Sequence, residues 1–125
     1  MNQDTIKNLL ELKHNWDGYG AYKFTKSHID RALELYSAIH NYYLTNQIDL
    51  SLLPFIAPCS NNYILFDWTG KKFTDKELEI YVSCYLDAPL EYLKEEYRDT
   101  SNSEEEGCFS MEKVNTLLDW LFSRE

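Results

Sequence analysis

Residues 77–86 read Glu-Leu-Glu-Ile-Tyr-Val-Ser-Cys-Tyr-Leu, and the alternation in this stretch decides the fold. It places on one face the side chains of Leu78, Ile80, Val82, Cys84 and Leu86. A period of two predicts a β-strand with one buried and one solvent-facing side, as in antiparallel sheets. Residues 63–68 also alternate and are rich in β-forming residues. Because a turn containing Gly70 joins the two stretches, we expect them to pair antiparallel.

The sequence on either side of this hairpin offers further extended segments. Upstream, Pro54 and Pro58 bracket a short extended piece at residues 55–57. Downstream, residues 90–97 fit either a helix or another strand, and a hairpin return from 77–86 favours the strand. Residues 99–107 are rich in Asp, Ser, Asn, Glu and Gly, which predicts a mobile loop.

Three segments have helical spacing. The clearest begins at Ser27, which stands three residues before Asp30 as in a capping box. Its apolar stripe comprises Ile29, Ala32, Leu33, Tyr36, Ile39 and Tyr43. Residues 4–14 predict a shorter helix, and Ser110 is expected to cap a last one. The inward positions of that last helix are Val114, Leu117, Leu118 and Leu121. Between the helices and the strands, we expect inward packing of Leu50, Leu52 and Leu53.

Together these segments predict an α+β fold. We expect a small antiparallel sheet of three to four strands, with N-terminal helices and a C-terminal helix packed on one face. The 125 residues match one domain, 1–125. Hydrophobic residues make up 44% and aromatic residues 15% of the chain, which is enough for a core and unlike a disordered protein. The start of the chain is polar and no apolar run approaches the roughly 20 residues that span a bilayer, so we expect a cytoplasmic protein.

The acidic charge is concentrated in one part of the chain. Residues 1–74 hold seven acidic and seven basic side chains, whereas residues 75–125 hold fourteen acidic and five basic ones. The whole net charge of -9 therefore lies in the C-terminal part. That part would repel a phosphate backbone, which disfavours direct nucleic-acid binding. A protein partner with a basic surface fits better, and the alternative is that the charge only keeps the chain in solution.

The residues able to carry chemistry do not form a recognisable catalytic or metal site. His28 and His40 lie twelve residues apart on one predicted helix, too far to share a metal. His14 near Asp17 could form an acid–base pair, but a polar surface pair is far commoner. The cysteines are odd in number and form no Cys-x-x-Cys pair, which indicates free thiols: Cys59, Cys84 and Cys108. We therefore expect no enzyme, no metal and no cofactor.

The most unusual stretch is Asn15-Trp16-Asp17-Gly18-Tyr19-Gly20-Ala21. Its glycines supply the positive φ that a tight turn needs. The turn is either a recognition loop with aromatic anchors or a connector between two helices, and the connector is the commoner of the two. As an alternative function, residues 14–21 would form the centre of a small enzyme or ligand-binding module.

This stretch resembles a set of small, mostly uncharacterised bacterial proteins. They share an Asn-Trp-Asp-Gly-Tyr-Gly-Ala segment followed by a proline, a turn, an apolar strand and Glu-Trp. Here the pattern continues at Pro58 and at Asp67-Trp68, with Asp67 in place of Glu and Asn61-Asn62 in place of a glycine-containing turn. The resemblance covers about the first two-thirds of the chain. It implies a setting in mobile-element and bacterial defence gene neighbourhoods, and it brings no catalytic residue.

These features predict a protein-binding protein of the antitoxin, immunity or inhibitor type that acts through its acidic C-terminal half. Anchoring area would come from a tyrosine patch on the solvent-facing side of the sheet, unless a helix covers it. The tyrosines of that patch are Tyr63, Tyr81, Tyr85 and Tyr92. The partner-binding residues we expect are Glu79, Tyr81, Tyr85 and Glu95, with an acidic loop formed by Glu104, Glu105 and Glu106.

Overall fold

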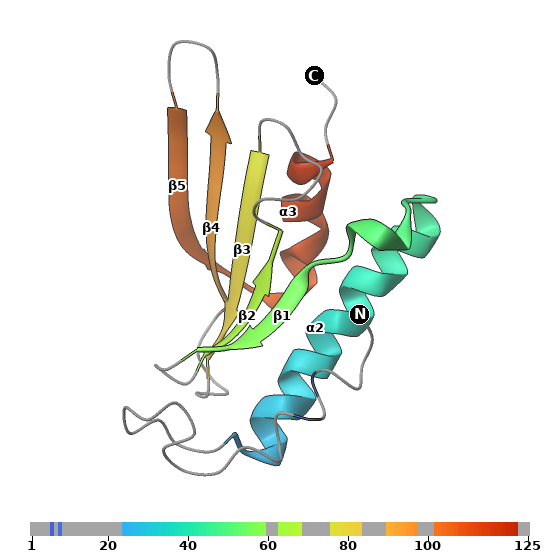
Figure 1. Cartoon of the computed structure of the whole chain (residues 1–125), viewed down its shortest axis with the longest axis vertical. Helices are drawn as coiled ribbons and strands as arrows, with labels where there is room; N and C mark the ends of the chain where they lie inside the picture. The colour runs from blue at the N-terminus through green and yellow to red at the C-terminus, as the bar shows by residue number, and fades with distance from the viewer. Residues whose placement is uncertain are drawn as a thin grey trace.

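The fold is α+β, as the sequence predicts. The computed structural model describes residues 6, 8, 24–59, 63–68, 76–83, 90–97 and 102–122. The helices are α2 (Lys26–Thr45), η2 (Leu50–Leu52), η3 (Met111–Lys113) and α3 (Val114–Leu121). The strands are β1 (Phe55–Pro58), β2 (Ile64–Asp67), β3 (Lys76–Val82), β4 (Leu90–Tyr97) and β5 (Asn102–Phe109). Figure 1 shows the sheet on one side of the molecule and helices α2 and α3 on the other.

The sheet has five strands in the order β1-β2-β3-β4-β5, and every neighbouring pair is antiparallel. The pairing of 63–68 with the strand at 77–86 is confirmed by β2 and β3, in which Phe66 lies opposite Ile80. Residues 90–97 form β4, so the strand alternative was correct. The expected count of three to four strands was too low. The piece after Pro54 is a paired strand, and a further strand lies where a loop was expected.

That further strand, β5, corrects the loop prediction for 99–107. Local composition is poor for a strand, but each residue of β5 has a partner on β4. Glu105 lies opposite Lys94, and their charged groups are 3.5 Å apart. The hydroxyl of Tyr92 donates to the Glu105 carboxylate over 2.6 Å. Cross-strand pairs of opposite charge and of aromatic with polar side chains therefore stabilise an acidic run that has little strand preference of its own.

Gly107 has a specific place in this pairing. It lies directly opposite Tyr92, whose ring lies next to it. A Cβ at residue 107 would come within 3.1 Å of the Tyr92 hydroxyl oxygen and 3.2 Å of the ring carbons. The absence of a side chain thus allows Tyr92 to reach Glu105 and to pack edge-on against Phe109, with ring centroids 5.9 Å apart.

Helix α2 supplies the longest apolar surface packed on the sheet. Its N-cap is Thr25 rather than Ser27, since the Thr25 hydroxyl accepts from the His28 backbone N–H at 3.2 Å. The buried residues of the helix are His28, Ile29, Ala32, Leu35, Tyr36, Ile39, Tyr42 and Tyr43. Most of the predicted stripe is among them, and Leu33 is only partly buried. The helix ends at Thr45.

Helix α3 buries the four residues predicted for it, Val114, Leu117, Leu118 and Leu121. Ser110 precedes the short η3 helix and makes no side-chain cap, so it does not cap α3 directly. Between α2 and the strands, the connecting leucines differ: Leu53 is buried, whereas Leu50 is 45% exposed. Several predictions lie outside the described residues, namely most of the 4–14 helix, the turn at 15–20, and the end of the 77–86 strand with Cys84, Tyr85 and Leu86.

Strand register assigns every described strand residue to one of two faces. On β3, Leu78, Ile80 and Val82 are fully buried and face the helices, together with Ile64 and Phe66 of β2. The alternate residues lie on the opposite side, which we call the outer face. No helix within the described part of the chain is long and apolar enough to cross a membrane.

Candidate protein-binding face

The outer face is strongly acidic. The register of β2 to β5 places on it the carboxylates of Asp67, Glu77, Glu79, Glu91, Glu95, Glu104 and Glu106. The strand lysines lie on the other side: Lys76 and Lys94 take the same face as Leu78. The described residues therefore contribute no Lys or Arg to the outer face. A surface with one sign of charge attracts a surface of the opposite sign and repels phosphate groups.

Aromatic and apolar side chains lie among these carboxylates. Tyr63 and Tyr81 pack edge to face, with ring centroids 6.0 Å apart and an interplanar angle of 80°. The Tyr81 hydroxyl donates to the Glu79 carboxylate. Burial first, and then this carboxylate, raise the pKa of Tyr81, so the hydroxyl stays protonated at neutral pH. The pair forms an amphipathic element, the kind of group that supplies contact area in protein interfaces.

An open hollow of about 670 Å³ lies beside this tyrosine pair. From the outer face it is lined by Tyr63, Tyr81, Glu91, Leu93, Glu106 and Cys108. Its walls thus combine aromatic rings with carboxylates from β4 and β5. Such a combination suits the side chain of a lysine or an arginine, because the rings take the methylene groups and the carboxylates take the charge.

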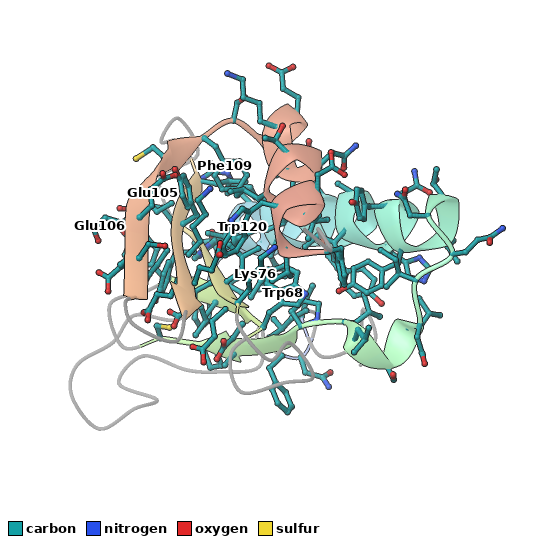
Figure 2. All side chains as sticks on the ribbon, turned by 90° about the horizontal axis from the view of Figure 1, so that it is seen from above. Trp68, Lys76, Glu105, Glu106, Phe109 and Trp120 are labelled. Atoms are coloured by element: carbon teal, nitrogen blue, oxygen red, sulfur yellow. The ribbon has the colours of Figure 1, made fainter. Side chains whose placement is uncertain are left out.

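Glu105 and Tyr92 are placed differently from the prediction. Both belong to the helix-side face, where Glu105 accepts from Tyr92 and lies near Lys94. The hydrogen bond from Tyr92 and then the Lys94 charge hold the pKa of the Glu105 carboxyl below its ordinary value. The Lys94 ammonium lies 4.9 Å from the centre of the Trp120 ring of α3. In Figure 2, Glu106 points away from the core while Glu105 lies toward Phe109 and Trp120. Glu105 therefore belongs to the link between the sheet and α3.

Of the other residues predicted for partner binding, the outer face brings together Glu79, Tyr81, Glu95, Glu104 and Glu106. Tyr85 lies outside the described residues. The partner-binding residues expected from the sequence did not include Asp67, Glu77, Glu91 and Leu93, although the alternation of 77–86 already places Glu77 on the same side as Glu79. A signal for the last two was present: once 90–97 is a strand, its period-two alternation puts Glu91, Leu93 and Glu95 on one side.

His28 and Cys59 have structural surroundings. His28 is buried against Phe24, and its Nε2 lies 2.7 Å from the Val82 carbonyl oxygen. Burial lowers the pKa of His28, so the ring is neutral at pH 7. Burial first, and then the nearby carboxylates, raise the pKa of the Cys59 thiol, which disfavours a reactive thiolate. Within the described ranges, no three His, Cys, Asp or Glu side chains are grouped so as to hold a metal ion.

Comparison with protein-family models, with curated proteins and with solved structures finds no match for the chain. The resemblance carried by residues 15–21 stays a sequence-based expectation.

Proposed function

We propose that this chain is a non-enzymatic protein-binding protein of the antitoxin, immunity or inhibitor type, and that its outer face binds a protein with a basic surface. The observation that carries the proposal is the set of carboxylates on β2 to β5, among which the described residues place no Lys or Arg. The resemblance of the 15–21 turn supports a setting in a bacterial defence or phage-related system.

Solubility alone does not account for this distribution of charge. On α2 the exposed charges have both signs, as in the pair of Lys26 with Asp30, whose charged groups are 3.0 Å apart. Mixed signs are sufficient to keep a small domain in solution. Carboxylates of one sign across a sheet face repel each other, and this cost is offset when a cationic surface binds. The face is thus better suited to recognition than to hydration.

Charge and aromatic area have separate roles in this proposal. The carboxylates increase the rate of encounter with a basic partner and make that rate fall with salt. The Tyr63–Tyr81 pair and the hollow beside it supply buried contact area that slows dissociation. Binding is therefore expected to weaken with salt without vanishing.

The test compares two double variants with the same change in net charge. Glu91→Lys/Glu106→Lys reverses charge on the outer face, and Glu34→Lys/Glu112→Lys reverses exposed charge on the helix side. The full chain of each form is immobilised, and the proteins it captures from its source cells are identified and then titrated as purified partners at two salt concentrations. We expect the wild type and the helix-side variant to bind alike and the outer-face variant to lose the partner. Equal capture by both variants would move the interface elsewhere, with the 15–21 turn as the next candidate.

A further inference from the structure

The two edges of the sheet differ in how they present backbone hydrogen-bonding groups. One edge is β1, a strand of four residues that ends at Pro58. The other edge is β5, a strand of eight residues without proline. Among the described residues, no strand lies beyond β5, which forms the left border of the sheet in Figure 1. An edge strand of this length is a template on which another strand can pair.

The hydrogen-bond pattern identifies which residues of β5 face that edge. The Trp68 N–H donates to the Leu78 carbonyl at 2.9 Å, so residue 78 on β3 faces β2. Because the direction alternates along a strand, Glu79 faces β4 and pairs with Leu93. Tyr92 and Lys94 then face β5 and pair with Gly107 and Glu105. The backbone N–H and C=O groups that point away from the sheet are therefore those of Asn102, Glu104, Glu106 and Cys108.

The same reasoning shows that the β1 edge is closed to a long partner strand. The Cys59 N–H donates to the Tyr63 carbonyl at 2.9 Å, so residues 55, 57 and 59 face β2. The outward backbone positions of β1 are then Ile56 and Pro58, and a proline has no N–H to donate. Of the two edges, β5 is the one able to accept a full ladder.

We propose that β5 receives an extended basic segment of the partner as a sixth, antiparallel strand, with Lys or Arg side chains opposite Glu104 and Glu106. This inference rests on the proposed function, since it specifies how the basic partner binds. Residues opposite each other in hydrogen-bonded pairs project to the same face. The basic side chains would therefore lie at alternate positions of the segment, on the outer face, beside the hollow to which Glu106 contributes.

Charge selects this occupant over a second copy of the chain. Two β5 strands paired antiparallel around Glu105 would set Glu104 against Glu106, and like charges directly opposite destabilise a sheet. A basic segment meets the same positions with attraction. Glu105 does not compete for it, because its carboxylate is engaged with Tyr92 and Lys94 on the other face.

The test uses a capped octapeptide of alternating Lys and Val as the probe, with the full-length chain. Two derivatives of the probe carry backbone N-methyl groups, one on every Lys and the other on every Val. In the proposed register the Lys amides face β5 and the Val amides face solvent. N-methylation of Lys removes the inter-strand hydrogen bonds, and we expect it to weaken binding roughly tenfold or more, whereas N-methylation of Val leaves binding within about twofold. Titration by NMR, following the amides of β5, gives both affinity and location.

Matched variants at residue 108 test the same backbone hydrogen bonds by changing the protein instead of the peptide. Cys108→Pro removes one outward N–H without changing any charge, and Cys108→Ser keeps it. We expect weaker peptide binding only in the proline variant, with both melting like the wild type, since edge positions with solvent-facing N–H groups tolerate proline.

Each alternative has a distinct result. If both methylated peptides bind with equal, salt-dependent affinity, the added strand is overturned. The proposal that the outer face binds a basic partner would then still stand. A preference for the Lys-methylated peptide, or no binding of the unmodified one, would overturn the proposal as stated. Sedimentation that shows a dimer of the wild type and a monomer of Cys108→Pro at neutral pH would identify a second copy as the occupant of the edge and overturn the proposal.

Discussion

Replacement of Trp68 tests whether a buried hydrogen-bond chain joins the sheet to α2. Trp68 is fully buried, and its indole N–H donates to the Tyr43 hydroxyl oxygen at 2.9 Å. That hydroxyl donates in turn to the Leu52 carbonyl at 2.7 Å. One phenol group thus connects the end of β2, helix α2 and the η2 segment, and its loss leaves buried polar groups without partners.

The expected magnitudes follow from the groups that each substitution removes. Tyr43→Phe leaves the indole N–H and the Leu52 carbonyl without their partner, which costs about 2–3 kcal/mol of the free energy of unfolding. Trp68→Phe removes the donor and part of the ring volume, which costs roughly 2–4 kcal/mol. The hydrogen bond between the two residues is lost only once in the double variant. The double variant should therefore lose less free energy of unfolding than the sum of the two single losses, by about 1 kcal/mol.

Urea denaturation followed by far-UV circular dichroism measures these free energies without relying on tryptophan fluorescence. A total stability of about 5–15 kcal/mol would leave the single variants folded. The control cycle pairs Trp68→Phe with Tyr36→Phe, because Tyr36 lies two helical turns from Tyr43 and stacks on His40 with ring centroids 5.8 Å apart. The control pair should be additive within about 0.5 kcal/mol. Additivity in the Trp68–Tyr43 cycle as well would refute the hydrogen bond as a stabilising contact.

Two further changes, at Gly107 and at His28, should alter the stability of the fold in a defined direction. Gly107→Ala places a methyl group against the Tyr92 ring and should lower the free energy of unfolding by about 1 kcal/mol. In a Tyr92→Leu background the same change should be nearly neutral. An equal loss of stability in both backgrounds would contradict the contact between residue 107 and the Tyr92 ring. His28 has a lowered folded-state pKa, so its contribution to stability is present above the unfolded pKa of 6.5 and is lost as pH falls through the folded value. Urea midpoints between pH 7.5 and 5.5 should thus fall more steeply in the wild type than in His28→Gln, whereas parallel slopes would mean that the ring titrates normally.

Local sequence pattern predicted the elements whose residues face a core. The alternation of Leu78, Ile80 and Val82 identified β3 and its buried face, and the spacing of the leucines identified α3. The local sequence pattern was insufficient where contacts with a neighbouring strand determine the secondary structure. In β5 the stabilising contacts come from Tyr92 and Lys94 of β4, and composition within 99–107 does not contain them.

The acidic character of the outer face could be predicted from the sequence, but the residues that lie on it could not. The charge distribution showed that the acidic residues are concentrated in the C-terminal part of the chain. Only the strand register shows that Glu104 and Glu106 lie on the outer face and Glu105 on the other face. A shift of one residue in the pairing would exchange these faces. The predicted helix start was two residues late, because Thr25 and Ser27 can both cap a helix and only the geometry of the first turn shows that Thr25 does so.

The order of the strands in the sheet has a consequence for how the chain folds. Each strand pairs only with the strand before or after it in the sequence. Every ladder can therefore close from a hairpin over a short loop, with little loss of chain entropy before the first contacts form. The sheet can grow hairpin by hairpin, and the docking of α2 and α3 is the step that brings distant parts of the chain together. We expect refolding to be fast for a protein of this strand content, with its rate limited by helix docking rather than by strand pairing.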